Sequence, residues 1–436
     1  MNVLVVGSGG REHAFVDVLS KSRDIESLHA APGNAGMADL ATCHAVPVND
    51  LAGLVALAQR LAVGLVVVGP EVPLVAGLVD KLEAVGIPAL GPNKAAAQLE
   101  GSKAFMKDLC RRARIPTAGH RAFNDASEAL AWCGNIEDWP CVIKADGLAA
   151  GKGVIIAQNE QEACDAVRAI MLDEQFGKAG ERLLIEEFLK GEELSVIALV
   201  DGETVAVLEP SRDHKRAFDG DKGPNTGGMG AYSPTSLLTP RIYEQIEERV
   251  LIPTVHALAK QGKPFRGLLY AGLMLTGEGP MVLEFNVRGG DPEMEILLPR
   301  LKTDALQLFL ATATGTLDQI EEIEWTSDAC CGVVLTDGDY PLSTTPGAPI
   351  TGIEQAEALP GVRVYHSGTK REVDGKLVTA GGRVLCVTAL GSDLADAQRR
   401  VYEAVERIHF RGARFRRDIG TREIQRSASP PAPAAG

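Results

Sequence analysis

The sequence has no long apolar run, no paired-cysteine motif and no excess of positive charge. None of its apolar runs approaches the ~20 residues that a membrane-spanning helix needs, so no membrane partner is expected. The 44 Lys and Arg residues are outnumbered by 58 Asp and Glu residues, which gives a formal net charge of −14. That balance disfavours nucleic-acid partners and anionic membranes, although a local basic pocket can still hold an anionic substrate. The first residues read as a strand with no basic segment, so no secretory leader is expected.

None of the eight cysteines stands in a Cys-x-x-Cys motif or at a metal-ligand spacing. They lie mostly in apolar stretches such as "WPCVIKAD" and "RVLCVTAL". Buried free thiols and a reducing, cytoplasmic location are therefore expected. No Ser-His or Cys-His arrangement is evident either, so nothing points to a covalent protein nucleophile.

Length and pattern predict an α/β chain of several domains. A chain of 436 residues is too long for one core, and about three domains are expected. In the N-terminal part, strand patterns alternate with helical patterns, which predicts a parallel, doubly wound sheet. The predicted division is an N-terminal domain 1–102, a central domain 103–328 with a small mobile lid at 123–190, a β-rich C-terminal domain 329–426, and a disordered tail 427–436.

The stretch "VVGSGGREHAF", residues 5–15, runs from a strand through glycines into a helix. Gly7 and Gly9 fit the first two positions of the dinucleotide fingerprint Gly-x-Gly-x-x-Gly, but the third position is Glu12. The second strand also ends without the carboxylate that would hold a ribose, so a nicotinamide oxidoreductase is disfavoured. A phosphate site at the helix N-terminus, assisted by Arg11, and a plain structural turn both stay open.

The stretch "KADGLAAGKGV", residues 144–154, resembles a Walker loop without being one. Only three residues separate Gly147 from Gly151, and Gly153 follows the lysine where a hydroxyl is needed. The flanks read as strands, which predicts a glycine-rich hairpin over a triphosphate with Lys144 as a point charge behind it. A flexible surface hairpin is the alternative.

The stretch "PMVLEFNVRGGDPEME", residues 280–295, combines strand alternation with polar side chains. Alternation predicts one polar face with Val282, Glu284, Asn286 and Arg288, and one core face with Met281, Leu283, Phe285 and Val287. Two oxygen ligands on a rigid strand suit Mg²⁺, and an arginine one step further can reach a phosphoryl group or a carboxylate. A solvated strand face that ends in a turn is the alternative.

Two further segments are polar and rich in charge. In "IEEFLKGEEL", residues 185–194, the backbone of a hinge could read an adenine edge while Glu193 takes ribose hydroxyls. Alone, this segment reads as a charged turn. Residues 211–230 read as a long loop without its own secondary structure, which is usually functional or disordered. Its end at 226–230 suits backbone approach to an anion.

Taken together, these segments resemble the ATP-grasp ligases and, among them, the phosphoribosylamine–glycine ligase family. The resemblance is carried, over residues 1 to about 425, by "GSGGREHA", "APGNAG", "GPEVPLVAG", "GPNKAAAQLEGSKAFMK", "VIKADGLAAGKGV", "DHKR…GPNTGGMGAYSP" and "GGRVLCVTALG". It implies an ATP-grasp fold that uses ATP as co-substrate, with Mg²⁺ or Mn²⁺. It also implies that ATP phosphorylates the glycine carboxylate and that the amine of 5-phosphoribosylamine then attacks. The oligomeric state stays open, with a monomer as the working expectation.

The resemblance also implies roles for individual residues. The implied ATP-binding residues are Lys103, Lys144, Lys152, Glu186, Leu189 and Glu193. The implied metal ligands are Glu284 and Asn286. The implied catalytic residues are Arg288, which steadies the acyl phosphate, with Asp213 and Lys215. The implied substrate-binding residues are Gly9, Gly10, Arg11, Asn34 and Asp291.

The chain departs from the family pattern at two positions. Gly289 stands where the family usually has Phe or Leu, and it is expected to loosen the backbone after the metal strand. Glu295 stands where the family has Gln, and it is expected to add a negative charge near an anion site. Two rivals stay in view: another ATP-grasp enzyme such as a carboxylase, and a non-catalytic nucleotide-binding regulator, which would be expected to lose Glu284 or Arg288.

Overall fold

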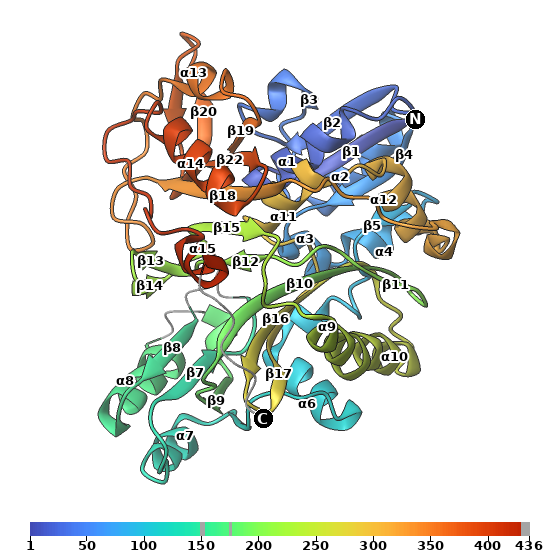
Figure 1. Ribbon diagram of the computed structural model, residues 1–436. Helices are drawn as coiled ribbons and strands as arrows, with labels where there is room; N and C mark the ends of the chain where they lie inside the picture. The colour runs from blue at the N-terminus through green and yellow to red at the C-terminus, as the bar shows by residue number, and fades with distance from the viewer. Residues whose placement is uncertain (149–152, 174–176, 429–436) are drawn as a thin grey trace.

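The computed structural model describes residues 1–148, 153–173 and 177–428. The N-terminal part is a five-stranded parallel sheet in the order β3-β2-β1-β4-β5 (Figure 1). Its strands are β1 (Asn2–Gly7), β2 (Ser27–Pro32), β3 (Thr42–Cys43), β4 (Val63–Val68) and β5 (Ala89–Leu90). Its helices are α1 (Gly10–Leu19), α2 (Leu51–Arg60), α3 (Glu71–Ala76) and α4 (Leu78–Glu83). The predicted doubly wound parallel sheet is confirmed.

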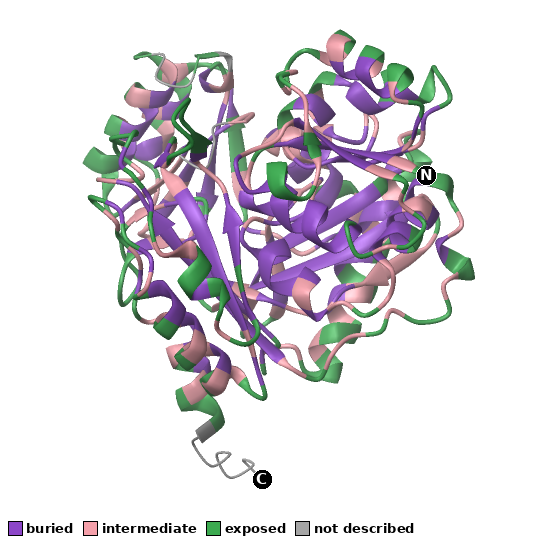
Figure 2. Ribbon diagram, turned by 90° about the horizontal axis from the view of Figure 1, so that it is seen from above, coloured by how far each residue is buried: buried purple, intermediate pink, exposed green. Residues whose placement is uncertain are grey.

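Both faces of this sheet are covered, which explains why its central strand is a continuous apolar run. Residues 3–6 of β1 are all 0% exposed. Val3 and Val5 pack in one cluster with Phe15 of α1, whereas Leu4 and Val6 pack in another with α2. Figure 2 shows the buried strands at the centre of the molecule. The sheet therefore presents its strand ends, rather than a face, to ligands.

The central part is a four-stranded antiparallel sheet in the order β11-β10-β16-β17. Its strands are β10 (Glu192–Asp201), β11 (Val205–Val207), β16 (Arg266–Thr276) and β17 (Gly279–Asn286). The helices of this region are α5 (Gln98–Gly101), α6 (Lys103–Ala113), α9 (Pro240–Ile246), α10 (Ile252–Lys260), α11 (Glu293–Leu297) and α12 (Ala305–Thr314). A π-helical segment, Glu247–Leu251, joins α9 to α10.

A β-bulge in β17 changes which side chains face the cavity. Leu273 pairs with Val282 and the next residue back, Gly272, pairs with Glu284, so Leu283 is an extra residue. Val282 consequently packs in the core, whereas Leu283 packs with Met281 in a small cluster beside the cavity. The predicted placement of these three apolar side chains is wrong.

The predicted common face of Glu284, Asn286 and Arg288 is confirmed, because all three line the cavity. The core placement of Phe285 and Val287 is confirmed as well, since both belong to a buried cluster.

A small antiparallel sheet in the order β6-β9-β7-β8 forms the lobe at the lower left of Figure 1. Its elements are β6 (His120–Phe123), α7 (Ala126–Cys133), β7 (Cys141–Ala145), β8 (Val154–Ala157), α8 (Glu160–Met171) and β9 (Leu183–Glu187). The lobe has its own apolar core, with buried residues from the strands and from both helices. The predicted hairpin is present as β7 and β8, but Gly151 and Lys152 lie outside the described residues.

The C-terminal part is a five-stranded sheet in the order β12-β15-β18-β22-β19. Its strands are β12 (Arg212–Asp213), β15 (Gly230–Ser233), β18 (Ala329–Thr336), β19 (Val362–His366) and β22 (Arg383–Gly391). Its remaining elements are β20 (Thr369–Arg371), β21 (Leu377–Thr379), α13 (Ile353–Glu357), α14 (Leu394–Val405) and α15 (Thr421–Ala428). Segment 211–230 therefore has secondary structure of its own, contrary to the prediction, because its two ends pair with each other and with β18.

The domain boundaries at 102, 328 and 426, and the limits of the lid, stay predictions. Within the described ranges, no helix is both long and apolar enough to cross a membrane.

Candidate active site

A cavity of ≈ 570 Å³ lies where the three larger sheets and the small lobe meet. It is lined by thirteen of the predicted site residues: Gly9, Arg11, Lys103, Lys144, Glu186, Leu189, Glu193, Asp213, Lys215, Glu284, Asn286, Arg288 and Asp291. Gly10 and Asn34 are not among the lining residues, and Lys152 lies outside the described part of the chain. Residues from six separate stretches of sequence thus meet at one site.

Lys144 and Glu186 lie side by side on the neighbouring strands β7 and β9. The Lys144 ammonium is 3.0 Å from Glu186 Oε2 and donates a hydrogen bond of 3.1 Å to the carbonyl of Leu283. The second oxygen, Glu186 Oε1, is buried and has no hydrogen-bond partner among the described residues. A buried acceptor without a donor costs free energy, and a ligand that donates a hydrogen bond to this oxygen would remove that cost.

Lys107 is a site residue that the sequence analysis missed. It is 0% exposed on α6, its ammonium lies 2.9 Å from Glu186 Oε2, and it donates to Thr117 Oγ1 and the Ala118 carbonyl at 2.9 and 3.2 Å. Burial lowers the pKa of Lys107, and Glu186 opposes that shift. A lysine among the buried apolar positions of α6 was the signal in the sequence. Its contacts hold Glu186 from behind.

The cavity has an apolar end that fits a flat ring such as adenine. Ala118, Leu189 and Met274 are buried together there, with Met281 and Leu283 against them. Glu193 lies on β10 opposite Met274, and burial raises the pKa of its carboxyl. The residues at this end therefore combine an apolar slot with a carboxyl at its edge.

Positive charge surrounds Glu284. Burial alone would raise the pKa of this carboxyl, but Lys215, Lys144, Lys103 and Arg288 together lower it to about 2. The Lys215 ammonium is 3.5 Å from Glu284 Oε1, and the Asn286 side-chain nitrogen is 3.5 Å from the same oxygen. Glu284 is therefore ionised at neutral pH.

The Glu284 and Asn286 side chains fit a divalent cation that takes few protein ligands. They offer a charged carboxylate and an amide oxygen on one strand face, both toward the cavity. Mg²⁺ completes its shell with phosphate oxygens and water, so two protein oxygens suffice. The described residues hold no cluster of three or more His, Cys, Asp or Glu side chains suited to a metal, which is consistent with such an open site.

Arg288 is fixed by two carboxylates from the N-terminal part. It lies 3.3 Å from Glu71 and 3.2 Å from Glu100, and it also donates to Asn286 Oδ1 at 3.3 Å. Burial raises the pKa of Glu100 to about 7, although Arg288 opposes the shift. At Glu71, burial also favours a higher pKa, but Arg288 acts in the opposite sense and the net effect is a lower pKa. Neither glutamate was singled out in the sequence, since only the fold brings them to Arg288.

A second group of hydrogen-bonded polar side chains, those of Ser195, Asp213 and Tyr270, lies near Lys215. Ser195 Oγ donates to Asp213 Oδ1 at 3.3 Å and shares a 2.9 Å hydrogen bond with the Tyr270 hydroxyl. Burial opposes a charge on Lys215, but Tyr270, Asp213 and Glu284 raise its pKa well above the usual value. Burial also raises the pKa of the neighbouring Glu293 to about 7, with Asp213 adding to the shift.

In the glycine loop of the N-terminal part, the Glu12 side chain takes the position that a bound anion would have at the Gly9 N–H. Glu12 accepts a 2.6 Å hydrogen bond from the Gly9 N–H, and its other oxygen lies 2.6 Å from Arg11 Nε. Arg11 is buried and also donates to the Gly289 carbonyl at 2.9 Å. At Gly7, φ is +130° and a Cβ would lie 2.5 Å from Glu12 Cγ, so this position needs glycine. A phosphate could reach these N–H groups only by competing with Glu12.

Two other predicted substrate residues are engaged in contacts within the protein. Asn34 donates to the carbonyls of Ser8 and His366 and accepts from two N–H groups of its own turn. Asp291 lies 3.0 Å from Arg383. Their roles as substrate ligands stay predictions.

The two departures from the family pattern have different consequences. A Cβ at Gly289 would lie 2.6 Å from Met294 Cγ, so Met294 occupies the space in which a bulky side chain would stand. Glu295 is 0% exposed, and neither of its oxygens has a partner among the described residues. Burial and Asp291 raise the pKa of Glu295 well above its usual value, which disfavours the expected added negative charge.

The fold and the site together define an ATP-grasp enzyme: an antiparallel sheet that carries Glu284 and Asn286, a small lobe that carries Lys144, and a cavity between them. The predicted ATP-grasp fold is confirmed. The chain belongs to the phosphoribosylglycinamide synthetase family. The family's N domain matches residues 1–100, its ATP-grasp (A) domain residues 101–294 and its C domain residues 330–422.

Similar proteins extend over nearly the whole chain. A phosphoribosylamine–glycine ligase of Vibrio vulnificus is 48% identical over 98% of this chain and 99% of the relative. One from Agrobacterium fabrum is 49% identical with the same coverage. The crystal structure of the Thermotoga maritima phosphoribosylamine–glycine ligase gives a TM-score of 0.84 at 34% identity and covers 96% of this chain and 100% of that one. A biotin carboxylase from Campylobacter jejuni shares the fold alone, with a TM-score of 0.72 at 14% identity.

Replacing Lys107 by Met should raise the KM for ATP by about 10-fold, because Glu186 loses the partner that holds it beside Lys144. The matched control is Arg111→Met, one turn further along α6 and exposed. Steady-state kinetics with melting curves of both variants provides the measurement. An unchanged KM for ATP in a folded Lys107→Met protein would contradict the positioning role.

Proposed function

We propose that the chain is an ATP-dependent ligase that joins glycine to 5-phosphoribosylamine, giving glycinamide ribonucleotide, ADP and phosphate. Membership of the family and the names of the relatives support the reaction. The observation that carries the proposal in this chain is the common face of Glu284, Asn286 and Arg288. This face lines one cavity together with Lys144 of the small lobe and Lys103 of α6.

The chemistry follows from the poor reactivity of a carboxylate. The glycine carboxylate must first take the γ-phosphoryl group of ATP, which gives a glycyl phosphate, and the amine of phosphoribosylamine then displaces phosphate from the carbonyl carbon. Both steps need placement and charge stabilisation rather than a protein nucleophile. A divalent cation held by Glu284 and Asn286 would neutralise charge on the phosphates.

The chain's own residues divide this work between the two sides of the cavity. Lys103 and Lys144 face the phosphates of ATP, while Leu189 and Glu193 hold the adenosine end. Lys215, held charged by Asp213 and Glu284, faces the transferred phosphoryl group together with Arg288. The cavity lining and the charges described above support these roles.

The phosphoribosylamine is assigned to the N-terminal side of the cavity, where Gly9, Arg11 and Asp291 line the wall. Gly10 and Asn34, which the family resemblance also implies as substrate-binding residues, are not among the residues that line this wall. A nicotinamide oxidoreductase is disfavoured at the same place, because the Glu12 carboxylate covers the start of α1 where a pyrophosphate would bind. All eight cysteines are free thiols, which supports a reducing, cytoplasmic location.

The proposal is tested by phosphate release from ATP with freshly made phosphoribosylamine, with glycine, with both and with neither. Both substrates together should give sustained release with matching formation of glycinamide ribonucleotide. Release that depends on bicarbonate instead would identify a carboxylase, and no release under any condition would contradict the ligase assignment.

Replacing Glu284 by Ala should lower kcat at least 100-fold, about 3 kcal/mol of activation free energy, because one of two protein ligands of the metal is lost. The control is Glu278→Ala, an exposed glutamate in the turn that precedes β17. Circular dichroism verifies the fold of both proteins. Near-normal kcat at saturating magnesium would show that Glu284 does not hold the metal.

A further inference from the structure

The hairpin β13 (Arg216–Phe218) and β14 (Lys222–Asn225) lies between two residues that line the cavity, Lys215 before it and Thr226 after it. The Thr226 N–H and hydroxyl both donate to the Lys215 carbonyl at 2.8 Å. The hairpin forms a two-stranded sheet of its own, and Phe218 is 49% exposed. Such a ribbon is marginally stable alone, so its position depends on what holds its tip.

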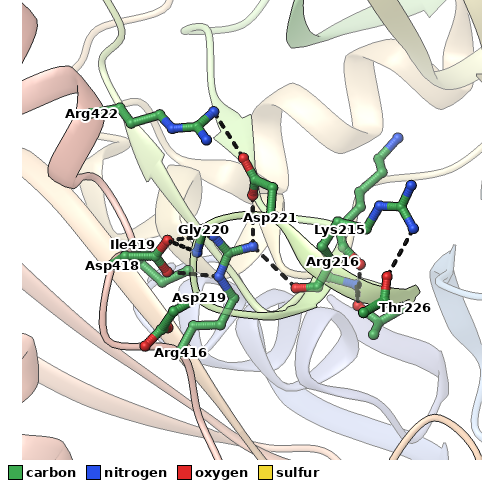
Figure 3. A network of polar contacts seen from close by, with 12 residues as sticks. Lys215, Arg216, Asp219, Gly220, Asp221, Thr226, Arg416, Asp418, Ile419 and Arg422 are labelled. Carbon is green, nitrogen blue, oxygen red and sulfur yellow. Dashed lines mark hydrogen bonds and ion pairs between the residues drawn. The ribbon is translucent and has the colours of Figure 1, made fainter.

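The tip is held by a segment from the C-terminal end of the chain. Arg416 donates to Asp418 through Nε and Nη2 at 2.8 and 2.7 Å, and its Nη1 lies 2.9 Å from Asp221. The same Nη1 donates to the carbonyl of Arg216 at 3.1 Å. Figure 3 shows the guanidinium between these groups, with Arg422 reaching Asp221 from the other side at 2.9 Å.

We call the contacts of Arg416 with Asp418, Asp221 and the Arg216 carbonyl the Arg416 clamp, and backbone hydrogen bonds reinforce it. The Gly220 N–H donates to Asp418 at 2.8 Å, and the Arg417 N–H donates to Asp219 at 2.8 Å. The Arg416 side chain is 1% exposed, whereas Asp221 and Asp418 are partly exposed, so removing either carboxylate would leave a buried guanidinium short of a partner, which is costly. The segment itself is anchored by Tyr402, whose hydroxyl donates to the Arg416 carbonyl at 2.9 Å.

The hydrogen bond from Arg416 to the Arg216 carbonyl holds the backbone one residue from Lys215, which lines the cavity. The bond from Arg416 reaches the carbonyl of Arg216, and the preceding residue is Lys215, whose ammonium lies 3.5 Å from Glu284. His214, on the other side of Lys215, is buried, and burial together with Arg416 lowers its pKa to about 3. It is therefore neutral and does not compete with Arg416 for the two aspartates.

We propose that Arg416 is a positioning residue that fixes the β13–β14 hairpin so that Lys215 stays beside Glu284 in the phosphoryl-transfer part of the cavity. The C-terminal segment would then set the geometry of a site formed largely by the rest of the chain. This inference rests on the proposed function. It goes beyond that function because it assigns a role in the reaction to a residue remote from the cavity.

The first test replaces Arg416 by Lys, which keeps the charge but loses the bidentate fork. We expect kcat to fall about 10- to 100-fold, the order expected for a small misplacement of a reacting group, with the KM for phosphoribosylamine changed by less than about 2-fold. Asp221→Asn, at a half-exposed position, should change kcat in the same direction and keeps the test available if Arg416→Lys fails to fold. The control is Arg417→Lys, the exposed neighbour.

The second test shows whether Arg416 acts through Lys215. If it does, Arg416→Lys or Asp221→Asn combined with Lys215→Ala should lose no more kcat than Lys215→Ala alone. Hydrogen exchange over 215–226 should also accelerate in the Arg416 and Asp221 variants, with the N-terminal sheet unchanged. The proposal would be overturned if the losses of kcat in the single variants multiplied in the double variants. It would also be overturned if the Arg416 and Asp221 variants had a lower melting temperature but an unchanged kcat. The unaltered protein's release of phosphate with both substrates tests the proposed function separately.

Discussion

The arrangement of the site depends on the concentration of positive charge around Glu284. Lys103, Lys144, Lys215 and Arg288 come from four different segments of the chain, and together they lower the pKa of this carboxyl to about 2. Buried cations are costly unless they are paired, so each needs partners of its own. Glu186 pairs with Lys144, and Glu71 and Glu100 pair with Arg288. Asp213 and Glu284 stabilise the charge on Lys215. The result is a cavity with several positive charges around one ionised carboxylate, which supports the proposed binding of ATP phosphates and a divalent cation there.

This constraint also explains why distant segments must be held accurately. Lys144 is placed by a strand of the small lobe, whereas Lys215 is placed by a hairpin that has no core of its own. The hairpin is tied to the C-terminal segment through Arg416, and Arg288 is tied to the N-terminal part through Glu71 and Glu100. Each end of the chain therefore contributes to the charge balance of a site that lies mainly in the middle of the sequence.

The sequence predicted the parallel sheet and the polar face of β17, because continuous apolar runs and alternation are local signals. It failed where a local irregularity or a distant contact decided the outcome. The extra residue Leu283 reversed the faces before Glu284, and strict alternation has no means of showing a bulge. Lys107 and Glu100 entered the site only through tertiary contacts. Segment 211–230 read as a loop because its strands are only two to four residues long, and because the strand at its end, β15, pairs with β18 far along the chain.

The proposed reaction requires the glycine carboxylate to become the phosphoryl acceptor. Glycine labelled with ¹⁸O in both carboxylate oxygens tests this requirement, through mass spectrometry of the phosphate and of the ligated product. If the carboxylate attacks the γ-phosphorus and the amine then displaces phosphate, each phosphate released should carry a single ¹⁸O, and the new amide should keep the other. Product formation with unlabelled phosphate would contradict the proposed reaction, because the carboxylate oxygen would then never have bonded to phosphorus.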